Sequence, residues 1–196
     1  MTYRSNRYPA ELIDVVHLTG ERVVIRPVLP QDRELLVRFF HDLSPAARCR
    51  RFMHPVNEPS LKMLRQFTQV DHATHVALIA EIFADGRETV ISEARYVRTV
   101  EASSAEVSIS VAERWQRKGL AKLMLAKLEY GAAAAGVRRI VGETFADNEK
   151  MISLARRAGF VISDCMRGVV RLEKTLRLRD TSIPAQPARR RNNEAL

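Results

Sequence analysis

Extended segments of the chain are marked by apolar positions that alternate with polar ones or run without a break. The strictest alternation covers residues 106–111, where the apolar side chains fall on one face of a strand and Glu106 falls on the other. Residues 75–97 indicate a β-hairpin, because two apolar stretches flank the turn signal Asp85-Gly86. The predicted strands are residues 22–27, 75–83, 89–97, 106–111, 138–145, 160–163 and 169–173.

Elsewhere the apolar spacing lengthens to the three or four residues that are typical of a helix. Leu120, Met124 and Leu128 stack at intervals of four in a helix that we expect to run from residue 118 to Gly136. The other helices are predicted to start near Pro30, to restart at Ser44-Pro45, to cover residues 61–70, and to follow a cap at Asp147 or Asn148. This order of strands and helices indicates the α/β class.

The length and composition favour one compact unit. A chain of 196 residues has the size of a single domain, which we place at residues 19–176 between an N-terminal extension (1–18) and a basic tail (177–196). No apolar run approaches the roughly 20 residues needed to cross a bilayer, and the N-terminus lacks the apolar core of a secretory signal. We therefore expect a cytoplasmic protein with no membrane partner.

The formal net charge of +9 suggests a polyanionic partner: nucleic acid, anionic lipid or a phosphate-rich cofactor. About a third of the excess lies from Arg177 onward, in a tail with two prolines and an Arg-Arg-Arg run that we expect to be disordered. The rest of the chain shows no recognition-helix, zinc-finger or aromatic single-strand signature, which argues against nucleic acid as the partner.

Cysteine and histidine offer no metal or redox site. Cys49 and Cys165 are isolated and have no further ligand at metal-binding spacing, so we expect neither a disulfide nor a bound metal. The histidines are scattered, and we interpret each as structural: His17, His41, His54, His72 and His75.

The strongest candidate for chemistry is the run Gln-Arg-Lys-Gly-Leu-Ala-Lys at residues 116–122, which joins a predicted strand to the start of a long helix. The first amides of a helix have no internal partner, the helix dipole adds positive charge, and Gly119 lets a phosphate approach the backbone. The alternative is a tolerated glycine among solvated basic residues. The run is neither a Walker loop nor a dinucleotide fingerprint, so ATP and NAD are not favoured.

This run resembles the pyrophosphate-binding motif of the GNAT-type N-acetyltransferases. Asn148 and the segment Leu-Ala-Arg-Arg-Ala-Gly-Phe at 154–160 are similar to the family's second conserved segment. The front end, residues 25–52 with Leu-Ser-Pro at 43–45, resembles the bacterial Pat-type protein lysine acetyltransferases. The resemblance covers roughly residues 7–175. It implies the GNAT acyl-CoA N-acyltransferase fold, with a central mixed sheet of about six to seven strands flanked by helices.

The resemblance also implies how acetyl-CoA would bind. A splay between the strand ending at Val111 and the strand at 138–145 would admit pantetheine, whose amides would meet main-chain groups near Ile109 and Val111. Asn148 would lie near the pantetheine arm. The loop would hold the pyrophosphate through positions Gln116, Arg117, Lys118, Gly119, Leu120, Ala121 and Lys122.

An amine with a pKa near 10.4 must lose a proton before it attacks a thioester, so a general base is useful. Glu106 matches the position of a catalytic glutamate in many GNAT members, although it also suits an ordinary strand-end carboxylate; Glu143 and Glu93 are the reserves. Many members carry a tyrosine that protonates the departing sulfur, where this chain has Ala155. A thiol of pKa near 8.5 can still leave as thiolate.

The predicted function is transfer of an acetyl group from acetyl-CoA to a primary amine, with a protein lysine as acceptor. We expect the loop at residues 53–59 and the hairpin around Gly86 to shape the acceptor site. Two alternatives stay open: a small-molecule amine acetyltransferase, and a catalytically silent acyl-CoA sensor. The oligomeric state does not follow from the sequence.

Overall fold

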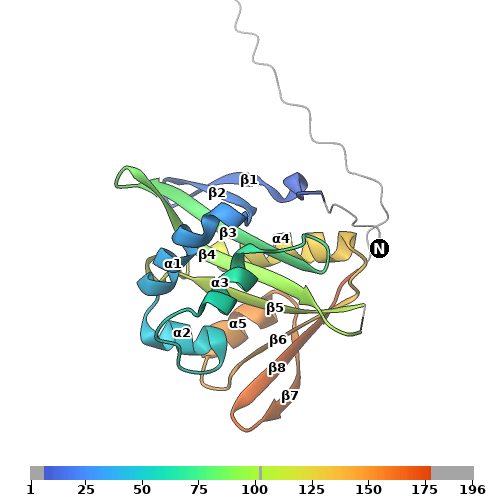
Figure 1. The fold of residues 1–196 in the computed structure, drawn as a ribbon. Coiled ribbons are helices and arrows are strands. Elements are labelled where there is room, and N and C mark those ends of the chain that lie inside the picture. The colour runs from blue at the N-terminus through green and yellow to red at the C-terminus, as the bar shows by residue number, and fades with distance from the viewer. Residues whose placement is uncertain (1–6, 102, 178–196) are drawn as a thin grey trace, which may run out of the picture.

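The computed structural model describes residues 7–101 and 103–177. Its centre is one sheet of eight strands in the order β1-β2-β3-β4-β5-β6-β8-β7, with helices on both faces (Figure 1). Neighbouring strands are antiparallel except β5 and β6, which run parallel. The sheet is therefore mixed and flanked by helices, which confirms the predicted fold class.

The predicted strands and helices are all present, with ends that shift by a few residues. The strands are β1 (Asp14–Leu18), β2 (Glu21–Pro27), β3 (His75–Ala84), β4 (Arg87–Arg98), β5 (Ser104–Val111), β6 (Arg139–Phe145), β7 (Val161–Met166) and β8 (Val169–Thr175). The helices are α1 (Arg33–Asp42), α2 (Pro45–Phe52), α3 (Leu61–Thr68), α4 (Leu120–Ala134) and α5 (Glu149–Arg157). Short 3-10 turns are η1 (Ala10–Leu12), η2 (Pro30–Asp32) and η3 (Glu113–Trp115).

Strand β1 lies inside the segment that we expected to be an N-terminal extension, and it brings the sheet to eight strands instead of six to seven. It is an edge strand of mixed exposure, with Val15 at 45% exposed, so its hydrophobic signal is weak. A two-residue turn at Thr19 and Gly20, with φ of 53° and 86°, sets it antiparallel to β2. The sheet therefore begins at Asp14.

Helices cover both faces of the sheet (Figure 1), and each face has its own apolar layer. Helix α1 packs Leu36 and Phe39 against β3 and β4, and α2 and α3 cover the same face. On the other face α4 buries Leu120, Met124 and Leu128, as the four-residue spacing predicted, and α5 adds to this layer.

The helix starts follow local side-chain chemistry. The side chains of Ser44 and Ser60 cap α2 and α3 by accepting a hydrogen bond from the amide of the third residue of each helix. Asn148, not Asp147, caps α5. Helix α4 begins at Leu120, two residues later than expected, because Gly119 takes a left-handed conformation with φ of 87°. The residue at the helix start is therefore set by the glycine.

Arg26 ties β2, β3 and η2 together on the α1 face. Its guanidinium donates to both carboxylate oxygens of Asp32 (2.7 and 2.9 Å) and to both of Glu81 (2.9 and 3.0 Å). Asp32, 2% exposed, also accepts the amide of Leu29 at 2.7 Å. The hydrogen bond to Asp32 raises the pKa of Arg26 although burial opposes it. The cluster therefore holds η2, the turn that leads into α1, against the sheet.

Candidate active site

The parallel strands β5 and β6 separate soon after they meet. Their register pairs are Ser104 with Arg139, Ala105 with Ile140, and Glu106 with Val141. Beyond these pairs β5 continues to Val111, while β6 runs on to Phe145 paired only with β8. The two strands therefore splay apart in the middle of the sheet, between residues 107–111 and 142–145, where the sequence resemblance placed a splay.

The peptide groups of β5 that point into the splay can be assigned from its hydrogen bonds. The carbonyl of Ser103 accepts amides at the start of β6, at 2.7 and 3.1 Å, whereas the amide of Ala112 donates to the carbonyl of Ile91 in β4 at 2.9 Å. Peptide groups of successive strand residues point to opposite edges. The groups of Ile109 and Val111 therefore face the splay, the direction that an extended ligand with its own amides requires.

The loop after β5 is shaped by its own side chains. Gln116 donates from Nε2 to the Val111 carbonyl at 3.2 Å, and the Lys118 ammonium lies 4.8 Å from the centre of the buried Trp115 ring. Arg117 has a left-handed φ of 62°, as Gly119 does. Left-handed residues in a turn aim successive amides to one side and are typical of anion-binding loops.

The start of α4 has the features of an anion site. Leu120 is fully buried and anchors the first turn, Ala121 is half-buried, and Lys122 is exposed. The first-turn amides have no partner within the helix, and they carry the positive end of its dipole. Among the described residues, no atom comes within 4 Å of the place where a Cβ would stand on Gly119. A phosphate can thus approach the backbone here.

Asn148 is 8% exposed and is engaged with its own surroundings. Its amide nitrogen donates to the hydroxyl of Thr144 in β6 at 2.9 Å, and its amide oxygen accepts from Met151 at 3.4 Å. These bonds fix the turn between β6 and α5. The expected contact of Asn148 with pantetheine stays a prediction.

Glu106 is exposed and stands at the last register pair before the splay. Its side chain shares the α1–α3 face of the sheet with Ser108 and Ser110, because alternate strand residues share a face. A carboxylate at this place can reach solvent and an incoming amine. The geometry fits the predicted base, and the role itself stays a prediction.

Of the two reserve candidates, Glu93 is a poor base. It is 3% exposed and binds Arg51 at 3.1 Å and Arg95 at 2.5 Å. Burial raises the pKa of Glu93, but the two guanidinium groups outweigh burial and lower the pKa overall. Glu143, in β6, is half-exposed and lies 3.6 Å from Arg171. Neither carboxylate is placed like Glu106, at the end of the β5–β6 pairing.

Ala155, at the position of the missing tyrosine, is 5% exposed and packs into the α4–α5 core layer. The side chain there is a methyl group that carries no proton. The chain therefore has no acid at this position, and a thiolate leaving group stays the expectation.

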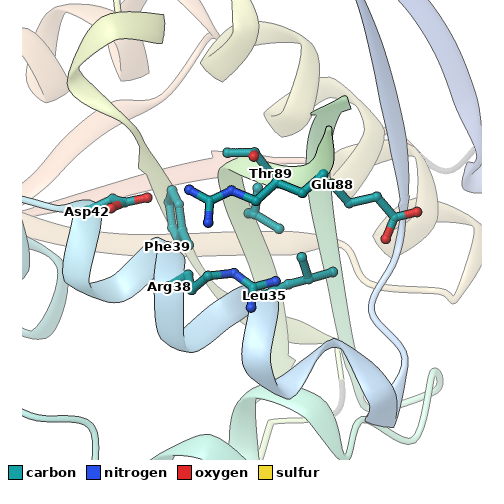
Figure 2. Close-up of a pocket in the computed structure, with 8 residues that line it drawn as sticks. Leu35, Arg38, Phe39, Asp42, Glu88 and Thr89 are labelled. Atoms are coloured by element: carbon teal, nitrogen blue, oxygen red, sulfur yellow. The ribbon is translucent and has the colours of Figure 1, made fainter. Parts of the chain in front are cut away.

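Two hollows lie beside α1. One, between α1 and the β3–β4 hairpin, is lined by side chains that include Arg38, Asp42 and Glu88 (Figure 2). With Arg87, its two basic and two acidic groups balance. Arg87 and Glu88 belong to the hairpin around Gly86 that we expected to shape the acceptor site, but none of the expected catalytic or cofactor-binding residues lines this hollow. The other, which we call the aromatic hollow, lies over β4 and β5 on the face of Glu106. Its lining includes Phe40, Arg51, Phe52, Phe67, Glu93 and Ser110.

Sequence reasoning missed the arginines of this second region. Arg95 stacks over the ring of Phe67, 4.2 Å from its centre, and binds the carboxylate of Glu93. Arg51 binds the same carboxylate from α2. The spacing of Glu93 and Arg95, two apart on one strand, places opposite charges on one face and could have signalled the pair. Arg51 lies on α2, a helix to which the sequence analysis assigned no functional role.

Other expectations concern absences. Within residues 7–101 and 103–177 no three His, Cys, Asp or Glu side chains gather as a metal site would require, and Cys49 and Cys165 are free thiols. No helix in the described part of the chain has the length and apolar character to span a bilayer. The predicted basic tail, from residue 178 on, lies outside the described residues.

Comparison with known proteins finds acetyltransferases among the relatives of this chain. The chain is 31% identical over 142 residues to "Acetyltransferase PA5475" of Pseudomonas aeruginosa, covering 72% of this chain and 76% of that protein. It is 32% identical over 170 residues to "Acetyltransferase Pat" of Mycolicibacterium smegmatis, covering 86% of this chain and 50% of that protein. The chain thus spans half the length of Pat.

The fold agrees as well. The crystal structure of the GNAT domain of S. lividans PAT superposes with a TM-score of 0.80 at 33% identity, covering 87% of this chain and all of that domain. The family model described as "Acetyltransferase (GNAT) domain" matches residues 22–161. The chain therefore belongs to the GNAT family of acetyltransferases, whose acyl donor is an acyl-coenzyme A.

Proposed function

We propose that the chain transfers the acetyl group of acetyl-CoA to the side-chain amine of a protein lysine, by direct attack in a ternary complex. The observation that carries the proposal is the splay of β5 from β6, with the peptide groups of Ile109 and Val111 turned into it. Similarity to the Pat-type enzymes supports lysine as the acceptor.

The donor would be held along two successive stretches of the chain. The peptide groups of Ile109 and the amide of Val111 face the splay and suit the amides of pantetheine, and the first-turn amides of α4 suit the pyrophosphate. Arg117 and Lys122 add exposed positive charge beside them. Acetyl-CoA supplies an activated acyl group whose thioester carbon accepts the amine.

Glu106 acts as the general base in this proposal. A lysine amine is protonated at neutral pH, so one proton must leave before the nitrogen lone pair can attack. The exposed carboxylate at the end of the β5–β6 pairing takes that proton directly or through one water. Because Ala155 carries no acidic proton, the sulfur leaves as thiolate and is protonated by solvent.

Calorimetric titration of the protein with acetyl-CoA tests the donor, with free CoA and ATP as comparisons. We expect micromolar binding of acetyl-CoA and none of ATP. Incubation of the loaded protein with lysine peptides, read by mass spectrometry, tests the transfer. Binding without transfer to any peptide or small amine would contradict the enzyme and identify an acyl-CoA sensor. No binding by folded protein would contradict both.

A further inference from the structure

We propose that the acceptor lysine lies in an acidic segment of its protein, which docks on a basic surface formed by α2, α3 and the aromatic hollow. This inference names the acceptor class and so rests on the proposed function. It starts from the position of the hollow, whose wall residue Ser110 lies on the same strand and face as Glu106.

Arg51 and Glu93 line the aromatic hollow, and the buried Arg95 lies behind them against the same carboxylate, so the cluster as a whole carries net positive charge. Glu93 stands against two guanidinium groups, those of Arg51 and Arg95. The nearby His75 accepts from Arg95 at 3.1 Å, and burial lowers its pKa to about 4, so it stays neutral at physiological pH. Two arginines and one carboxylate leave an excess of one positive charge in a region of low polarity.

This cluster also has hydrogen-bond donors to spare. Within the described chain, Arg51 Nε and Arg95 Nη2 are buried without an acceptor, and Arg95 is only 6% exposed. An unmet buried donor is unfavourable, and an anion that approaches it removes that cost. Arg51 lines the hollow itself, so a carboxylate entering from the rim meets its guanidinium first.

Helices α2 and α3, which contribute Arg51, Phe52 and Phe67 to the hollow, form its rim. The rim is also positively charged, over a wider area. Between residues 45 and 68 the chain has five basic side chains and a single carboxylate, Glu58. Helix α2 buries none of its residues, and Arg50 on α2 and Arg65 on α3 are exposed. Neither helix contains an acidic residue. A surface of this kind attracts an acidic partner and repels a basic one.

The spacing along β5 suggests where the partner's carboxylates lie. Ser110 is four residues beyond Glu106, about 13 Å along the strand. An extended peptide covers that distance in about four residues. With its lysine at Glu106, a peptide would therefore bring side chains three or four positions away to the hollow. In free lysine only the side chain separates the reacting amine from the carboxylate, and this length is shorter than the distance along the strand. Free lysine therefore cannot reach both Glu106 and the hollow.

The test uses three lysine peptides of one length that differ only at positions two to four from the lysine: glutamate, glutamine or arginine. We expect kcat/KM to be highest for the glutamate peptide, by roughly tenfold over glutamine at low salt, with the difference shrinking as salt rises. Equal rates, a preference for arginine, or equally rapid acetylation of free lysine would overturn the proposal.

Charge reversal on the rim supplies the second arm. The double variant Arg50→Glu/Arg65→Glu should lose most of the preference for the glutamate peptide, with the glutamine peptide nearly unaffected. Arg22→Glu makes the same change at an exposed position of β2 and should keep the preference. An unchanged preference in the double variant would overturn the proposal.

Failure of the donor reaction can be told apart from failure of this inference. Fluorescence anisotropy measures binding of the same labelled peptides to the whole chain without any turnover. Tighter binding of the glutamate peptide supports the docking surface even if no peptide is acetylated, which would count against the proposed function alone. Equal binding of all three peptides overturns the docking surface.

Discussion

Glu106 pairs with Val141 at the last register position that joins β5 to β6. The carboxylate therefore stands where the sheet stops being continuous and a ligand can enter between strands. An acid on a fully paired stretch would have no such access to a donor in the splay. This relationship carries the first prediction.

Replacing Glu106 by Gln removes the proton acceptor and keeps the size of the side chain. We expect kcat to fall by about a hundredfold or more, because a positioned general base contributes that much, while calorimetry finds acetyl-CoA affinity nearly unchanged. Glu21→Gln, an exposed carboxylate of β2, is the matched control and should retain wild-type turnover. A Glu106→Gln enzyme as active as the wild type between pH 6 and 9 would exclude this residue as the base.

Gly119→Val tests the phosphate cradle. The side chain would occupy the open space before α4, and the left-handed backbone would be strained. Acetyl-CoA binding should weaken more than tenfold in calorimetry, since the added group blocks the approach of the pyrophosphate. Gly86→Val offers the same strain, at φ of 75° and also without neighbours within 4 Å, in the β3–β4 turn. If both variants bind acetyl-CoA equally well, the cradle is wrong.

The Arg26 cluster predicts a stability effect. Asp32→Ala leaves a guanidinium that is mostly buried with half of its partners, so we expect a loss of about 3 kcal/mol in the free energy of unfolding. Glu101→Ala breaks the exposed pair with Arg139 and should cost less than about 1 kcal/mol. Urea denaturation measures both. Similar losses would show that burial does not govern these pairs.

His75 predicts a pH dependence of stability. Burial lowers its pKa in the folded protein to about 4, from 6.5 when exposed. Between these values the unfolded chain binds the proton more readily, so the melting temperature should fall as the pH drops from 7 towards 4. His75→Asn removes the titrating group, and its melting curve should depend less on pH over this range. An identical slope in wild type and variant would assign the effect to carboxylates instead.

The sequence anticipated the parts of the fold whose apolar spacing is long and regular. The alternation along β5 and the four-residue spacing of Leu120, Met124 and Leu128 both appear as predicted. Strand β1 escaped because half of an edge strand faces solvent, so its pattern is diluted. The start of α4 moved to Leu120 because a left-handed glycine, not the apolar period, decides where that helix begins.

The site divides in the same way. The run at residues 116–122 could be chosen from local sequence, because a helix start is a local feature. Glu106 could be chosen because it lies on the polar face of its strand and matches the position of a catalytic glutamate in the family that the chain resembles. The grouping of Arg51 with Glu93 and Arg95 could not, since it joins a helix to a strand more than forty residues away. No spacing in the sequence predicts that two arginines share one buried carboxylate.

The splay also has a mechanical meaning. The pairing that joins β1–β5 to the smaller part of the sheet, β6, β8 and β7, is short, with three register pairs between β5 and β6. In the proposed complex, a donor lying between the two parts of the sheet would add bonds across this short pairing, and its binding energy would be added to the stability of the folded protein. We expect amide hydrogens on both sides of this pairing to exchange with solvent faster in the unliganded protein than those deeper in either part of the sheet. A bound donor would in this way join the two parts of the sheet as well as supply the acetyl group.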